Sequence, residues 1–135
     1  METKFESRIG KVAAPEKRIY ELITDFRNFN QFIPAGKVED FEASGEQCQF
    51  SVSGIGKVIL QIVEKTPYQT VKVSGSGMAN QQFFFWVQLK QVSDEDTRVK
   101  LTIKADVNPM LKMMVSKPLQ GFLDKLMDAI ENYRF

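Results

Sequence analysis

The sequence predicts an α+β domain in which a curved antiparallel sheet of about seven strands wraps around a long C-terminal helix, with two short helices between the first and second strands. Residues 108–134 place apolar side chains three and four positions apart, which is typical of one face of a long amphipathic helix. Residues 37–107 instead alternate apolar and polar side chains in segments at hairpin spacing. A helix of this length must bury its apolar stripe against an equally long partner, and the sheet supplies one.

The N-terminal part of the chain predicts one strand followed by two short helices. Residues 4–12 alternate as a strand, and Pro15 then suits the first turn of a helix, with Glu16 at the positive end of its dipole. A second helical turn is expected over residues 28–32, followed by a loop at 34–36. The side chains expected on buried faces are Phe5, Ser7 and Ile9 in the strand and Ile19, Tyr20, Leu22, Ile23 and Phe26 in the first helix.

Six further strands are expected before the C-terminal helix, and the last has the cleanest alternation in the chain. Its buried face would carry Val99, Leu101, Ile103, Ala105 and Val107, and its solvent face Arg98, Lys100, Thr102, Lys104 and Asp106. Gly75, Ser76 and Gly77 are interpreted as a flexible connection before the fifth of these strands. The six strand ranges are 37–43, 47–53, 57–65, 70–74, 82–92 and 97–107, with turns at 44–46, 54–56, 66–68 and 93–96.

The C-terminal helix contains a proline, Pro118, within its periodic pattern. A proline inside a helix removes one hydrogen bond and bends the axis. The helix could therefore consist of two segments, 109–117 and 118–133, with a kink that gates a pocket. The interpretation we favour is that the bend lets the helix follow the sheet. The apolar stripe comprises Leu111, Met114, Val115, Leu119, Phe122, Leu123, Leu126, Met127, Ile130 and Tyr133.

The composition excludes several classes of chemistry. The chain of 135 residues suggests a single domain over residues 1–135, and 18 basic against 17 acidic residues leave a net charge of +1. This balance gives no support for a nucleic-acid partner or an acidic membrane. The sequence contains no histidine and only one cysteine, Cys48. Histidine-based catalytic triads and nitrogen–sulfur metal sites are therefore excluded, and no cofactor is expected.

The sequence also carries a weak indication of location. No stretch approaches the roughly 18 consecutive apolar residues that cross a bilayer, and the charged first residues lack the apolar core of a signal peptide. The single cysteine excludes an internal disulfide and fits a reducing compartment. We therefore expect a cytoplasmic protein without stable membrane insertion, either a monomer or a weak homodimer.

Residues 25–34 read DFRNFNQFIP, so that an acidic residue and an aromatic residue precede a short turn and a proline. With the order and length of the other elements, this segment resembles the START-like (SRPBCC) superfamily, whose fold is called the helix-grip, and in particular its polyketide cyclase/dehydrase and lipid-transport branch. The superfamily also includes aromatic-ring oxygenase domains, coenzyme-Q-binding proteins and chaperone activators, so the fold alone fixes little about function. The resemblance implies a cavity between sheet and helix that often holds a hydrophobic ligand.

The side chains expected to line such a cavity come from the inward strand faces, the short helices and the C-terminal helix. Met110, Met113 and Met114 form a flexible, polarisable cluster that could wrap an apolar ligand at the cavity mouth. The alternative for every apolar candidate is ordinary core packing, because burial is the norm for these residue types. The candidates are Phe29, Phe32, Phe50, Leu60, Val73, Phe83, Phe85, Leu101, Ile103, Met110, Met114 and Phe122.

The opposite face of the sheet presents a second feature. Phe84 and Trp86 alternate with Phe83 and Phe85, so they point away from the helix. If that face is open to water, the two rings form an aromatic patch that suggests a partner protein or a homodimer. The alternative, to which we lean, is cover by the aliphatic stems of neighbouring lysines such as Lys90 or Lys100.

Three functional hypotheses follow. The first is non-enzymatic binding or transport of a small hydrophobic ligand, favoured by the apolar inward faces and the absence of histidine. The second is a cyclase- or hydratase-like enzyme, which would require a polar group facing the cavity, such as Tyr20, Tyr68 or an inward Asp or Lys. The third is a protein-interaction module that uses the outer aromatics. The acidic candidates Asp25, Glu39, Asp40, Glu64 and Asp106 fall in no catalytic motif and are interpreted as surface charges.

Overall fold

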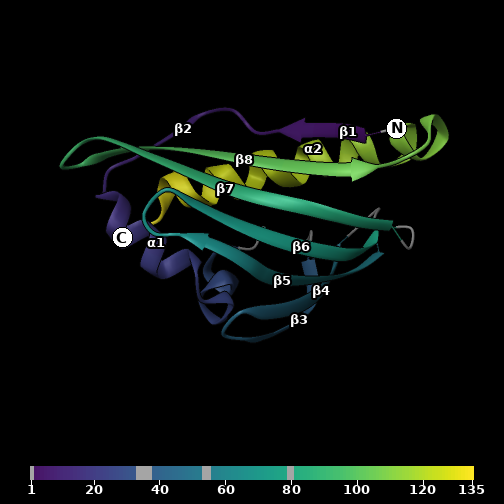
Figure 1. Ribbon diagram of the computed structural model, residues 1–135, viewed down its shortest axis with the longest axis horizontal. Helices are drawn as coiled ribbons and strands as arrows, with labels where there is room; N and C mark the ends of the chain where they lie inside the picture. Colours follow the sequence, from purple (N-terminus) through teal and green to yellow (C-terminus); the bar gives the residue numbers. More distant parts are fainter. Residues whose placement is uncertain (1, 33–37, 53–55, 79–80) are drawn as a thin grey trace.

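The computed structural model describes residues 2–32, 38–52, 56–78 and 81–135, which form one antiparallel sheet, two α-helices and a 3-10 helix (Figure 1). The predicted α+β helix-grip fold is therefore confirmed. The loop expected at 34–36 and most of the turn expected at 54–56 lie outside the described residues. The elements are β1 (Glu2–Glu6), β2 (Gly10–Val12), α1 (Glu16–Ile23), η1 (Phe26–Gln31), β3 (Val38–Ser44), β4 (Gln47–Val52), β5 (Gly56–Thr66), β6 (Thr70–Met78), β7 (Gln81–Ser93), β8 (Asp96–Asp106) and α2 (Pro109–Asn132).

The described strands are ordered β1-β8-β7-β6-β5-β4-β3 across the sheet, and β2 pairs with β8 beyond β1. Figure 1 shows α2 running along one face of this sheet, and α1 lies near the C-terminal end of α2. The core lies between α2 and that face, where the inward side chains of the strands meet the buried stripe of the helix. The stripe comprises Val115, Leu119, Phe122, Leu123, Leu126, Met127 and Ile130.

The first predicted strand is interrupted, which changes the side on which its residues face. Ser7 pairs with Leu101 on β8: its amide donates to the Leu101 carbonyl at 2.9 Å, and the Leu101 amide donates to Ser7 Oγ at 2.9 Å. After this point the buried positions switch from odd to even, so Gly10 and Val12 face inward. Ile9 is consequently 65% exposed, and its expected burial is wrong.

The second short helix begins at Phe26, two residues before the expected start at residue 28. Thr24 ends α1 by donating its hydroxyl to the Tyr20 carbonyl at 2.8 Å. Asp25 then begins η1, because its carboxylate accepts the Arg27 amide at 3.0 Å and pairs with the Arg27 guanidinium. The hydrogen bond from that guanidinium lowers the pKa of Asp25. Phe26 therefore belongs to the second helix rather than the first.

The interpretation of residues 75–77 as a flexible connection is wrong, because β6 continues through them to Met78. Gly77 has a φ of +108°, a conformation that favours glycine. A Cβ at this position would lie 2.1 Å from the Lys57 carbonyl oxygen on β5. Glycine here permits close approach of two strands rather than flexibility.

The alternation predicted for β8 holds except at Thr102, which is only 3% exposed although it faces away from α2. β8 is an interior strand, so Thr102 lies between Glu6 on β1 and Trp86 on β7. Its hydroxyl donates to Gln88 Oε1 at 3.0 Å, which satisfies the buried group. Neighbouring strands therefore cover a residue that alternation alone places in water.

Helix α2 is continuous from Pro109 to Asn132 and passes through Pro118 without a break, so the two-segment alternative does not hold. Asn108 caps its first turn by accepting the Leu111 amide at 2.8 Å. Near the other end, Arg8 pairs with Asp128 at 2.7 Å and also with Glu131. The C-terminal half of α2 is thereby attached to the segment that joins β1 and β2.

Gly10 allows β2 to approach α2 closely, and we predict that Gly10→Ala destabilises the fold. The new Cβ would lie 2.3 Å from Sδ and 3.1 Å from Cγ of Met127, whose side chain is fully buried. Such overpacking costs about 1–3 kcal/mol. The midpoint of urea unfolding measures it, with Gly45→Ala as the control because nothing lies within 4 Å of a Cβ there. Equal unfolding midpoints for both variants would contradict the prediction.

Candidate functional site

A small cavity of about 40 Å³ lies between the middle of α2 and the inward face of the sheet. Four strands, η1 and α2 contribute to its wall. The lining residues of the strands are alternate residues, and those of α2 are three and four positions apart. The inward face of the sheet and the apolar face of the helix therefore both contact the cavity. The wall consists of Phe29, Phe50, Val52, Val58, Leu60, Phe83, Phe85, Ile103, Leu119, Phe122 and Leu126.

Aromatic rings close the side of the cavity that faces η1 and β3. The ring centroid of Phe50 lies 6.1 Å from that of Phe29 and 6.3 Å from that of Phe122. Phe41 on β3 extends the group, with its centroid 6.0 Å from Phe29 and 6.2 Å from Phe50. Phe29 and Phe41 are only partly buried, whereas Phe50 and Phe122 belong to the core. The rings thus form a continuous path from the surface to the cavity.

The cavity wall offers no polar group among the described residues that line it. Its chemistry is therefore limited to apolar contact and ring packing. A volume of about 40 Å³ accommodates a few water-sized molecules, but an apolar wall gives water no hydrogen-bond partners. Pockets that hold drug-sized ligands measure roughly 300–1,000 Å³, so a molecule of that size fits here only after side chains rearrange.

The structure brings together seven of the twelve residues expected to line a cavity: Phe29, Phe50, Leu60, Phe83, Phe85, Ile103 and Phe122. Val73, Leu101 and Phe32 are buried elsewhere in the core. Phe32 packs against Tyr133 and Phe135, with centroid distances of 4.8 and 6.0 Å. Four wall residues were not among the candidates, although the same periodic patterns contain them: Val52, Val58, Leu119 and Leu126.

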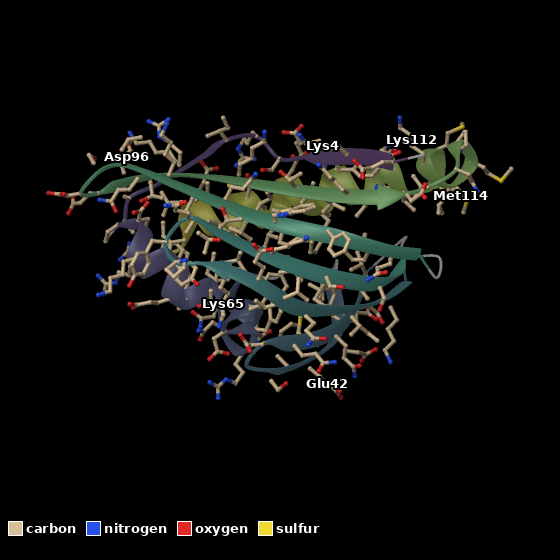
Figure 2. All side chains as sticks on the ribbon, in the orientation of Figure 1. Lys4, Glu42, Lys65, Asp96, Lys112 and Met114 are labelled. Atoms are coloured by element: carbon tan, nitrogen blue, oxygen red, sulfur yellow. The ribbon has the colours of Figure 1, made fainter. Side chains whose placement is uncertain are left out.

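Met110 and Met114 do not line the cavity, contrary to expectation. They are 73% and 66% exposed, and Met113 is exposed as well. Figure 2 shows Met114 at the end of the molecule, on the first turns of α2. These turns precede Val115, the first buried residue of the helix stripe.

The polar candidates lie away from the cavity wall. Tyr20 and Tyr68 pack edge to face with their centroids 5.4 Å apart, and neither lines the cavity. Glu39, Asp40 and Glu64 are exposed. Within the described ranges, no three His, Cys, Asp or Glu side chains gather as a metal site, and no helix is long and apolar enough to cross a membrane.

On the outer face of the sheet, lysines cover Phe84 and Trp86 in part, although they are not the lysines named above. The ring centroids of Phe84 and Trp86 lie 6.0 Å apart, and both side chains are half-buried. Lys72 Nζ lies 4.6 Å from the Phe84 centroid, and Lys104 Nζ lies 5.5 Å from the Trp86 centroid. These cation–π contacts stabilise the aromatic pair on a solvated face.

Cys48 is buried beside the cavity strands, and burial raises the pKa of its thiol to about 12. Because the thiolate is the reactive species, we predict that Ellman's reagent does not label the folded protein at pH 8 but labels it fully in urea. A Ser93→Cys variant in a Cys48→Ala background provides an exposed thiol as the positive control. Labelling of native Cys48 as fast as that control would contradict the assigned burial.

Comparison with known structures supports the fold. Norcoclaurine synthase from Thalictrum flavum, in complex with dopamine and hydroxybenzaldehyde, matches at 13% identity with a TM-score of 0.72, covering 100% of this chain and 90% of that chain. A START superfamily protein from Mycobacterium smegmatis matches at 15% identity and a TM-score of 0.63, covering 96% and 94%. A conserved protein from Geobacillus kaustophilus matches at 13% and 0.69, covering 97% and 93%. At these identities the likeness concerns the fold alone.

Sequence comparison identifies the family. No curated protein matches the chain. Residues 10–133, however, match the family of carbon monoxide dehydrogenase subunits named CoxG. This match spans most of the 135 residues and agrees with the START-like fold of the solved structures. The chain therefore belongs to the CoxG family, and it shares the fold of the START superfamily protein from Mycobacterium smegmatis.

Proposed function

We propose that this protein binds or carries a small hydrophobic molecule, such as a lipid, an isoprenoid or a polyketide-like compound, between the sheet and α2, without catalysing a reaction. The observation that carries the proposal is a cavity with a wholly apolar wall, five of whose side chains are phenylalanines. Ligand sites in proteins are predominantly apolar and concave. The likeness in fold to a synthase solved with two small aromatic molecules is consistent with this use of the fold.

The driving force for binding would be burial of apolar surface. A ligand that buries about 300 Å² gains roughly 7 kcal/mol at 25 cal/mol per Å², before the costs of association. The wall provides no partner for a polar group, and an unpaired polar group in such a site is costly. The bound part of the ligand must therefore be apolar, and any polar end must lie outside the cavity wall.

Admission of a ligand requires the cavity to enlarge. The contacts that would have to move are of different kinds on its two sides. The C-terminal half of α2 is attached by the ion pairs of Arg8 and by the close contact of Gly10 with Met127. On the other side, the rings of Phe29, Phe41 and Phe50 connect η1 with β3 and β4.

One backbone hydrogen bond also joins η1 to the β3–β4 hairpin. The Phe26 amide at the start of η1 donates to the Gly45 carbonyl in the hairpin turn at 2.6 Å. Phe29 lies one turn further along η1 and contacts the hairpin through its ring. Rings rotate without breaking hydrogen bonds, so we place the access route beside Phe29, between η1 and the hairpin.

The enzyme hypothesis receives no comparable support. It requires a polar pair that converges on the cavity, and no described residue of the cavity wall carries a hydroxyl, an amine or a carboxylate. The likeness to norcoclaurine synthase, at 13% identity, shows a shared fold and does not transfer an activity.

We predict that the purified protein binds neutral apolar molecules. Titration with N-phenyl-1-naphthylamine should give a saturable rise in fluorescence, because the dye emits strongly in apolar surroundings. Native mass spectrometry of freshly purified protein should show an added mass that solvent extraction removes. Neither a fluorescence rise nor an added mass, under conditions where urea unfolding confirms a folded protein, would refute the proposed function.

The access route generates a separate prediction for Phe29. Replacement by alanine removes the ring that contacts both Phe41 and Phe50 at the partly exposed end of the aromatic group. We expect Phe29→Ala to accelerate association of N-phenyl-1-naphthylamine several-fold in stopped-flow measurements, because fewer contacts must break. Phe84→Ala on the outer face is the matched control and should leave the rate unchanged. Equal rates for Phe29→Ala and the wild type would place the access route elsewhere.

A further inference from the structure

We infer that Gly75 and Phe83 together determine how large a ligand the cavity accepts, an inference that rests on the proposed function. The two residues are register partners on β6 and β7, and both are buried. A Cβ at Gly75 would lie 2.2 Å from Cζ, 2.4 Å from Cε2 and 2.8 Å from Cε1 of Phe83. The phenyl ring therefore occupies the place of a side chain that Gly75 lacks.

The row of residues across the sheet explains why space exists at this point. Gly75 pairs with Leu60 on one side and Phe83 on the other, and Phe83 pairs in turn with Ala105. Two small residues thus flank one large ring. The next row consists of large side chains throughout, namely Ile62, Val73, Phe85 and Ile103. On the face of the sheet that meets α2, the neighbours of Phe83 therefore project less than those of Phe85. The ring of Phe83 lies in the space that this leaves over Gly75.

This position of the ring leaves the cavity open. Phe83 lines the cavity, and its ring tip is the part that contacts the backbone of Gly75. If a methyl group occupied position 75, the ring would have to move, and the cavity it lines is adjacent unfilled space. A larger residue at 75 should therefore fill the cavity indirectly, by displacing Phe83. A smaller residue at 83 should enlarge the cavity, because Gly75 supplies no side chain to replace the ring.

Glycine at position 75 is not required by the backbone. The described glycines with positive φ are Gly56 and Gly77, so an alanine at 75 introduces no strain of that kind. The effect of Gly75→Ala should consequently come from the contact with Phe83 alone. Gly45→Ala is the matched control, since nothing lies within 4 Å of a Cβ at that position. Phe84→Leu is the control for Phe83→Leu, because Phe84 is the next residue of β7 and faces the other side.

The experiment measures displacement of N-phenyl-1-naphthylamine by alkylbenzenes of increasing chain length. Gly75→Ala should weaken binding of the longest alkylbenzenes roughly tenfold while benzene binds nearly as in the wild type, as overpacking of the site predicts. Phe83→Leu should shift the preference toward longer chains. The double variant Gly75→Ala/Phe83→Leu should recover much of the wild-type profile. A chain-length profile that is the same in Gly75→Ala, Gly45→Ala and the wild type would overturn the inference while leaving the proposed function intact.

A second arm tests the pair without any ligand. Urea unfolding of the two single variants and the double variant forms a thermodynamic cycle. Gly75→Ala should be destabilising beside Phe83 and close to neutral in the Phe83→Leu background, because the smaller side chain makes room for the methyl group. If the wild type binds neither N-phenyl-1-naphthylamine nor any alkylbenzene and native mass spectrometry shows no added mass, the proposed function fails, and this cycle alone decides whether the two residues are coupled. Additive effects of the two substitutions would overturn the inference in either case.

Discussion

The structure depends on the fit between one helix and one curved sheet. Helix α2 buries seven side chains in the core, and the inward residues of the strands supply the opposing surface. The close approach at Gly10 and Met127 fixes the C-terminal half of the helix against β2. Beneath the middle of α2, five phenylalanines and six aliphatic residues surround a small cavity. The cavity is what these side chains leave unfilled.

The absence of polar groups from the described cavity wall has an energetic consequence. A polar group in such a place would need a partner, and a ring needs none. A rearrangement of the aromatic rings would therefore break no side-chain hydrogen bond of the wall. Under the proposed function, this is the property that would let the wall adjust to an apolar molecule.

The sequence predicts the fold well where a periodic pattern of apolar residues is regular and extends over a long segment. The strand alternation in β8 and the helical stripe of α2 both reappear in the structure. The errors fall where tertiary contacts decide the outcome. Ile9 is exposed because a pairing with Leu101 resets the strand. Thr102 is buried because strands flank it on both sides, and Gly75 continues a strand because it pairs with Leu60 on β5 and Phe83 on β7.

The same distinction between local pattern and tertiary contact applies to the residues of the candidate site. Phe83 and Phe85 could be assigned to the cavity because a two-residue period places them on the helix-facing side. Met114 could not be excluded by the same reasoning, because its exposure depends on where α2 begins relative to the edge of the sheet, which no local pattern encodes. A site without polar anchors has no motif to read. Under the proposed function, selectivity would come from the shape of the cavity, and the sheet register brings together the pair Gly75 and Phe83 that we infer to set this shape.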